Sequence, residues 1–186
     1  KRILLKNEIF DFRIMSSPSE IMEILKGKEA EKANSARMVA GFCWPWSSKT
    51  DANGDLIKDV RIGDFAMPWE THDKITLTPP GYVKWFEWAY RPEGIKQVGC
   101  IYTAQGFEFD YIGVIIGNDL RYDPLSDSLT GDISASKDPM LKRDVQTFDM
   151  HVKNIYRTLL TRGMKGCYVF FTDKGTEDFF RNRMES

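Results

Sequence analysis

The sequence predicts an α/β fold in which helices flank a mostly parallel central sheet. Three observations support this prediction. Short apolar runs typical of buried strands recur along the chain, segments with helical periodicity separate several of them, and the first elements have the spacing of a strand–helix–strand unit. The chain has 186 residues, enough for one domain with a full hydrophobic core. We expect a single domain over residues 1–186, with surface excursions at 45–80 and 118–138.

The first strand–helix–strand unit begins with the alternating, β-rich segment EIFDFRIM at residues 8–15. Ser17 and Pro18 then form a typical helix start, and apolar residues follow at helical spacing. The apolar segment ARMVAGFCW at residues 36–44 predicts a buried strand. Because parallel strands need a crossover connection, this order favours a parallel pair.

The remaining elements follow the same reasoning. Asn53-Gly54 lies between polar residues and predicts a hairpin turn. We expect a short helix at 83–91, buried strands at 97–102, 109–116 and 166–173, a long amphipathic helix at 138–162 and a last helix at 175–184.

Composition excludes several classes of protein. The net charge is −1, so no overall field draws the chain to nucleic acid or to anionic lipid. Three scattered cysteines and two histidines give no zinc-site spacing, and free thiols favour a reducing, cytoplasmic location. No apolar run is long enough to cross a bilayer, so we expect no membrane partner. The chain begins without methionine, and we expect it to be part of a longer protein.

A short polar break separates two of the expected strands. It comprises residues 103–108 and follows an apolar strand, the position at which open α/β sheets commonly bind ligands. The break belongs to the segment YTAQGFEFD, with the pattern Q-G-x-E-F-D, and the later segment NIYRTLLTRGMKGCYVFF carries L-T-R at an expected helix end.

This pair of segments resembles motifs V and VI of superfamily-one helicases. The agreement is closer with the Schlafen group 3-type DNA/RNA helicase domain family. It extends through ARMVAGFCWPW, FAMPW, VGCIYTAQGFEFDYIGVIIGNDL and YRTLLTRGMKGCYVFFTD, which covers most of residues 36–173. In that family two RecA-like domains close on ATP.

The resemblance implies which half of the motor this chain represents. The chain has no GxxxxGK[ST] phosphate loop, so it is similar to the second, C-terminal RecA-like domain. We therefore expect ATP and Mg²⁺ to act in the full-length protein and neither to be held by this domain alone. The expected partners are an N-terminal RecA-like domain of the same protein and a single strand of DNA or RNA. Alone, the domain should hydrolyse nothing.

The resemblance also implies roles for residues at the nucleotide. Arg162 corresponds to the arginine finger, although an arginine at a helix end also complements the helix dipole. Gln105 and Gly106 would let the backbone approach the nucleotide. Glu108 would accept a hydrogen bond from the ribose, or would simply pair with a lysine at a strand edge. Arg37 falls where motif IV can carry a phosphate-sensing arginine, or is solvated at a strand start.

Four residues are candidate contacts for nucleic acid. Tyr102 and Thr103 would touch the backbone of the strand, although the tyrosine could equally be core. Trp44 and Trp46 would stack on bases. The alternative for the tryptophans, which we favour for two of the three at positions 44, 46 and 69, is that they pack a loop against the sheet.

Two other functions compete with the helicase. The domain could have kept the fold and lost motor activity, serving as a platform for nucleic acid or protein. Alternatively, it could be a Mg²⁺-dependent nuclease, if the carboxylates of Glu108, Asp110, Asp119 and Asp123 converge on a metal ion. We expect no metal ligands among the residues of the helicase assignment.

Overall fold

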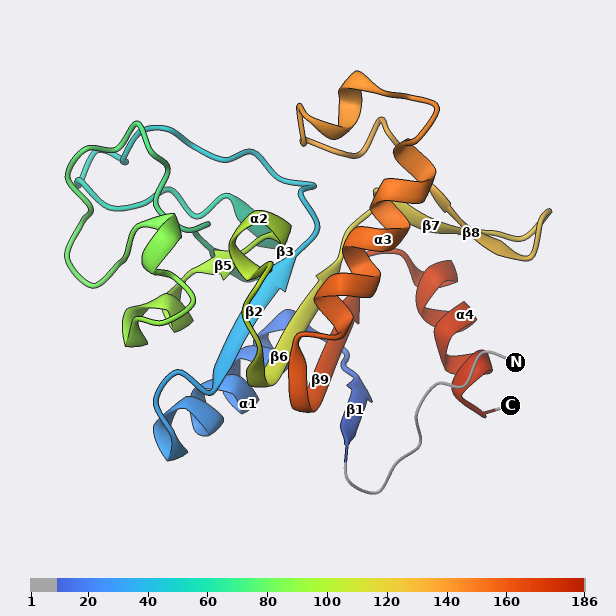
Figure 1. The fold of residues 1–186 in the computed structure, drawn as a ribbon, viewed down its shortest axis with the longest axis horizontal. Helices are drawn as coiled ribbons and strands as arrows, with labels where there is room; N and C mark the ends of the chain where they lie inside the picture. Colours follow the sequence, from blue (N-terminus) through green and yellow to red (C-terminus); the bar gives the residue numbers. More distant parts are fainter. Residues whose placement is uncertain (1–9, 186) are drawn as a thin grey trace.

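A computed structural model describes residues 10–185 and shows a five-stranded, all-parallel central sheet (Figure 1). The strand order across the sheet is β1-β9-β6-β2-β5. These strands are β1 (Asp11–Ile14), β2 (Ala36–Ala40), β5 (Val98–Gly99), β6 (Phe109–Ile116) and β9 (Gly163–Phe171). The predicted fold class is confirmed. Of the first expected strand at 8–15, residues 8 and 9 lie outside the described part.

Helices cover both faces of this sheet. They are α1 (Pro18–Glu31), α2 (Ile101–Ala104), α3 (Phe148–Leu160) and α4 (Lys174–Glu185), with 3₁₀ turns η1 (Trp85–Glu87), η2 (Pro92–Lys96) and η3 (Leu141–Arg143). Ser17 caps α1 as expected, because its hydroxyl accepts the Glu20 backbone N–H at 3.2 Å. Figure 1 shows α1 and α3 on opposite faces of the sheet.

The alternation of side chains along the strands creates two hydrophobic cores. Ile21 and Leu25 of α1 pack on one face with Ile115. Val152, Tyr156 and Leu159 of α3 pack on the other with Val114. Strand β6, in the middle of the sheet, is buried at seven of its eight positions. Such burial on both faces is why the central strands consist of nearly continuous apolar residues.

Two antiparallel hairpins extend from the sheet. One pairs β3 (Val60–Ile62) with β4 (Phe65–Met67), and the other pairs β7 (Leu120–Asp123) with β8 (Ser128–Gly131). The predicted Asn53-Gly54 turn is present with Gly54 at φ +80°, but it closes only a single bridge between Thr50 and Leu56.

Three element predictions need correction, and one of them, the short helix expected at 83–91, is only the 3₁₀ turn η1. The expected strand at 97–102 ends at Gly99, because the Thr103 side chain accepts the Cys100 backbone N–H and starts α2. The expected helix at 138–162 begins only at Phe148. Upstream of it, the Asp144 carboxylate accepts the backbone N–H groups of residues 146 and 147 in a local turn that competes with helix.

The polar break lies elsewhere than expected. Helix α2 and the residues after it carry the chain from the carboxyl end of β5 back to the amino end of β6 (Figure 1). Residues 105–108 therefore lie at the amino edge of the sheet, not at the carboxyl edge. Thr103 and Ala104, which the break was expected to include, are buried in α2.

Candidate functional site

The segments that carry the two motifs meet at the amino edge of the sheet. Strands β6 and β9 are parallel neighbours, and they begin at Phe109 and Gly163. The Phe109 backbone N–H donates to the Arg162 carbonyl at 2.8 Å, and Arg162 Nη1 donates to the Phe107 carbonyl at 3.3 Å. In the sequence, Glu108 lies between Phe107 and Phe109, the two residues that hydrogen-bond to Arg162. Arg162 and Glu108 thus belong to one edge of one surface.

Arg162 also closes the end of α3. Its Nε donates to the Thr158 carbonyl at 3.1 Å, and its Nη2 donates to the Thr161 hydroxyl at 3.3 Å. These contacts match the alternative role of an arginine at a helix C-terminus. All three acceptors of the guanidinium are neutral, however, and an arginine has five N–H donors. The side chain is partly exposed, so donors remain for a further acceptor.

The loop before β6 is open and leaves its polar groups uncommitted. Gly106 has φ +88°, a conformation that side chains disfavour, and nothing lies within 4 Å of the position where a Cβ would be. Gln105 and Glu108 are exposed. Within the described residues, the Glu108 carboxylate has no hydrogen bond or ion pair, so the expected alternative of a lysine partner is not observed. This loop can receive a polar ligand without breaking existing contacts.

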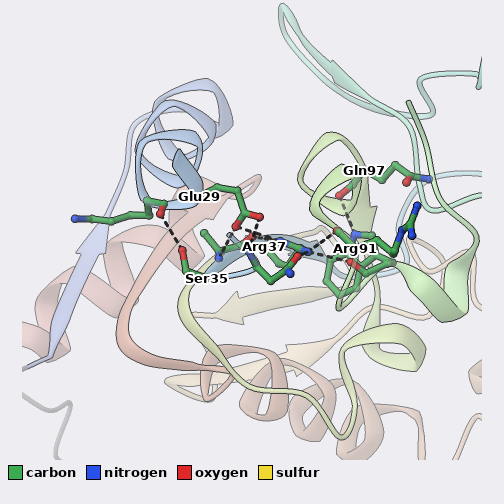
Figure 2. A network of polar contacts seen from close by, with 9 residues as sticks. Glu29, Ser35, Arg37, Arg91 and Gln97 are labelled. Carbon is green, nitrogen blue, oxygen red and sulfur yellow. Dashed lines mark hydrogen bonds and ion pairs between the residues drawn. The ribbon is translucent and has the colours of Figure 1, made fainter. Parts of the chain in front are cut away.

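Arg37 lies near the amino end of β2 but is buried beneath this edge, so its assignment to the nucleotide is corrected. Its side chain is 0% exposed. Figure 2 shows its guanidinium in the middle of a polar network. It donates to the carbonyls of Ala36, Trp88 and Arg91 and to the Asn34 amide oxygen, at 2.7–3.0 Å, and lies 3.3 Å from Glu29. These five partners use all five N–H donors. The alternative of a solvated arginine is equally wrong.

The network around Arg37 ties α1 and the η1–η2 segment to β2. Burial lowers the pKa of Arg37, and the neighbouring Glu29 carboxylate raises it in partial compensation. Gln97, also 0% exposed, extends the network: its amide contacts the Val83 backbone N–H and the carbonyls of Trp69 and Val83. The role of Arg37 is therefore to hold the fold together.

Tyr102 and Thr103 lie near the carboxyl edge, in α2. Tyr102 is 51% exposed, and its hydroxyl donates to Asp138 Oδ2 at 2.7 Å. Thr103 is 6% exposed, and its hydroxyl is engaged with the backbone of Cys100. A side chain that is buried and used as a helix cap cannot reach a nucleic-acid strand. Thr103 is therefore removed from the candidate contacts, whereas Tyr102 is accessible.

The tryptophans form an aromatic cluster that fastens the loop after β2. Each indole N–H donates to a backbone carbonyl: Trp44 to Arg61, Trp46 to Glu70 and Trp69 to Pro45. Trp69 is 2% exposed and its ring stacks on Phe42 at 5.5 Å. Trp44 lies 6.4 Å from Trp69, and Trp46 lies 4.5 Å from His72, between ring centroids. This is the packing alternative, and it accounts for Trp44 and Trp46 without a base.

The four carboxylates of the nuclease alternative do not converge. Glu108 and Asp110 are at the amino end of β6, while Asp119 and Asp123 follow its carboxyl end, so the eight-residue strand separates the pairs. Asp110 binds Lys32 and Lys165, at 2.9 and 3.0 Å, and Asp119 accepts the Tyr156 hydroxyl. Within residues 10–185, no three His, Cys, Asp or Glu side chains form a group that could hold a metal. The described residues therefore lack the carboxylate cluster that the nuclease alternative requires.

Sequence reasoning missed a buried acid beside the carboxyl edge. Glu70 is 2% exposed, and burial raises the pKa of its carboxyl to about 7. The Cys100 thiol donates to its Oε1 at 3.3 Å, while its Oε2 has no partner. A proline-rich, irregular segment surrounds Glu70 in the sequence, so no periodicity there could have signalled burial.

The fold and the amino edge define the class of protein. An all-parallel five-stranded sheet flanked by helices is consistent with a RecA-like α/β domain, and the two segments that resemble motifs V and VI meet at one edge of it. The chain belongs to the Schlafen group 3, DNA/RNA helicase domain family, whose model matches residues 2–173. Membership indicates a helicase-like role connected with nucleic acid.

A relative in Saccharomyces cerevisiae is 29% identical to this chain over 174 residues and is described as an uncharacterized protein. The match covers 88% of this chain and 35% of the relative, so the chain spans about a third of that protein's length. No solved structure matches the chain. Among the described residues, no helix has the length and apolar character needed to cross a membrane.

Proposed function

We propose that this chain is the second RecA-like domain of an ATP-dependent DNA or RNA helicase or translocase. ATP and Mg²⁺ would be held mainly by an N-terminal RecA-like domain of the same protein, and this domain would add Arg162 and Glu108. The observation that supports the proposal is the shared edge, where the backbone of Phe109 binds the Arg162 carbonyl and Arg162 binds the Phe107 carbonyl.

The residues of the edge fit a nucleotide. Arg162 has donors beyond its three neutral acceptors, Glu108 is exposed without a partner, and Gly106 leaves open space beside the backbone. A carboxylate accepts hydrogen bonds from sugar hydroxyls, and a guanidinium binds phosphate through paired N–H donors. The described residues offer no cluster for Mg²⁺, so the proposal assigns the metal to the partner domain.

Arg162 would act on the charge that develops during phosphoryl transfer. When bound, ATP supplies a γ-phosphoryl group whose oxygens carry that charge. An arginine presented from a neighbouring domain stabilises it, an effect of about 10³–10⁵ in rate. The present contacts of Nη1 and Nη2 are long, at 3.3 Å, and go to neutral oxygens. Charge-assisted bonds to phosphate are roughly twice as strong as neutral ones, so exchanging these contacts is favourable.

The test is the ATPase rate of the full-length protein carrying Arg162→Ala. We expect kcat to fall by about 10³ or more while ATP binding is largely retained. The matched control is Arg157→Ala, because Arg157 lies in the last turn of α3, the helix that Arg162 closes, and is exposed; within residues 10–185 its side chain hydrogen-bonds only to Asn154, at 2.9 Å. It should keep kcat.

Two outcomes would remove the proposal. Equal rates in the wild-type protein and Arg162→Ala would take Arg162 out of catalysis. A wild-type protein with no ATPase activity, with or without single-stranded DNA or RNA, would favour the inactive platform instead.

A further inference from the structure

A turn after the β7–β8 hairpin is anchored to the exposed tyrosine of α2. Asp138 is 1% exposed, and its Oδ2 accepts the Tyr102 hydroxyl. Its Oδ1 accepts the backbone N–H groups of Met140 and Leu141, at 2.8 and 3.2 Å. One buried carboxylate thus fixes both the turn and the tyrosine ring.

The same turn is fastened to the carboxyl edge of the sheet. The Lys137 backbone N–H donates to the carbonyl of Phe42, just beyond the end of β2, at 2.7 Å. The Lys142 backbone N–H donates to the Asp138 carbonyl at 3.2 Å, and the Arg143 N–H donates to the Met140 carbonyl at 3.3 Å in η3. Figure 1 shows η3 beyond the amino end of α3. Tyr102 and the turn therefore form one continuous surface, which we define as Tyr102 together with residues 136–143.

This surface presents cations that have no partner in the fold. Lys137, Lys142 and Arg143 are exposed, and their side chains make no hydrogen bond or ion pair within the described residues. Asp138 is buried, and its carboxylate binds the Tyr102 hydroxyl and the backbone of the turn rather than these cations. The neighbouring exposed carboxylate, Asp144, accepts the backbone N–H groups of residues 146 and 147. The lysines and the arginine are thus left for an external anion.

The tyrosine is arranged as a stacking platform. Half of its surface is exposed, yet its hydroxyl is held by Asp138, so the ring has little orientational freedom to lose on binding. Bases of single strands stack on such rings, and lysine and arginine bind the phosphates between bases. An acidic peptide would use the cations but has no group that requires an exposed aromatic ring.

We propose that Tyr102 and residues 136–143 form a binding site for single-stranded nucleic acid, in which Tyr102 stacks on a base and Lys137, Lys142 and Arg143 contact phosphates. The inference rests on the proposed function and deepens it, because it identifies where on this domain the strand binds. The site lies at the carboxyl edge of the sheet, and the nucleotide-contacting residues lie at the amino edge.

The experiment measures binding of fluorescein-labelled oligo-dT and oligo-U by anisotropy over a range of salt concentrations, using the full-length protein. The variant Lys142→Ala/Arg143→Ala removes two exposed cations, so the slope of log K against log salt should fall by about 1.4. Tyr102→Ala should weaken binding by roughly 5- to 150-fold, the equivalent of about 1–3 kcal/mol. Tyr102→Phe keeps the ring and should retain most of the affinity.

The matched control is Lys26→Ala/Lys58→Ala, because both lysines are exposed and line a surface pocket beside α1, on the other face of the sheet. It should leave affinity and slope unchanged. The inference is overturned if the wild-type protein binds neither oligonucleotide, if the control weakens binding as much as the Lys142/Arg143 variant, or if polyglutamate competes as well as unlabelled oligo-dT. Intact ATPase activity in any of these cases would leave the proposed nucleotide role standing.

Discussion

The buried carboxyl of Glu70 makes the stability of the fold depend on pH. The side chain is 2% exposed, its Oε2 has no partner, and Oε1 receives only a weak thiol donor from Cys100, at 3.3 Å. Burial disfavours the ionised form and raises the pKa from 4.5 to about 7. The hydrogen bond from the Cys100 thiol lowers this pKa, but by less than burial raises it.

The direction of the effect follows from proton binding. Between pH 4.5 and about 7 the folded chain holds the Glu70 proton and the unfolded chain has lost it. Stability falls with rising pH wherever the folded state binds more protons. The contribution of Glu70 is therefore intact below about pH 4.5 and lost as pH rises through about 7. At about 1.4 kcal/mol per pH unit, the loss amounts to roughly 3 kcal/mol.

The assay is urea unfolding of the chain from pH 4.5 to pH 8, compared between the wild type and Glu70→Gln. Glutamine does not titrate, so the stability difference between the two proteins should change by roughly 3 kcal/mol across this range, whatever the absolute cost of the new amide. The control is Glu23→Gln, because the Glu23 side chain is 78% exposed. A difference that stays constant with pH would refute the reasoning, since it would mean that Glu70 titrates normally in the fold.

Three further substitutions test the packing. Arg37→Ala should destabilise the fold by about 3–5 kcal/mol, since it removes a buried ion pair with Glu29 and leaves buried acceptors such as the Trp88 carbonyl without their donor, and a loss below about 1 kcal/mol in urea unfolding would contradict the network described. Gly113→Ala should cost about 1–3 kcal/mol, because its Cβ would lie 2.4 Å from Ile21 Cγ2. Gly27→Ala, where nothing lies within 4 Å of the new Cβ, should instead stabilise α1 by up to about 1 kcal/mol. Equal shifts in melting temperature for the two variants would contradict this difference in packing. Gly106→Ala should lower stability by about 1–2 kcal/mol through its φ of +88° alone, and an unchanged melting temperature would show that the loop relaxes.

The sequence was sufficient to predict the class of fold, because local patterns determine it. Buried strands of apolar residues, a capped helix at Ser17 and the amphipathic stripe of α3 are all properties of neighbouring residues. Arg162 and Glu108 share an edge because each lies directly before a strand of one parallel sheet, although the sequence predicted the opposite edge for the polar break. Whether these residues contact a nucleotide stays a prediction.

The wrong predictions concern residues whose burial or conformation depends on contacts that local sequence patterns do not reveal. The sequence predicts that Arg37 contacts a ligand, because its true partners cannot be identified from local patterns. Those partners, the carbonyls of Trp88 and Arg91, are more than fifty residues away in the sequence. Ile101 and Tyr102 favour strands by composition, yet the Thr103 cap turns them into a helix. Burial of Glu70 likewise depends on contacts that no local pattern reveals.

The order of the strands constrains how the protein can be made. Strand β9 is the last to be synthesised, yet it lies between β1, which is first, and β6. Within the described residues β1 pairs only with β9, so it has no sheet neighbour until the chain is complete through residue 171. A nascent chain on the ribosome therefore leaves β1 unpaired, and one edge of β6 unpaired after residue 116, until β9 is made. Truncation before β9 should yield an aggregation-prone product rather than a smaller folded domain, and folding should be slow for a chain of this size.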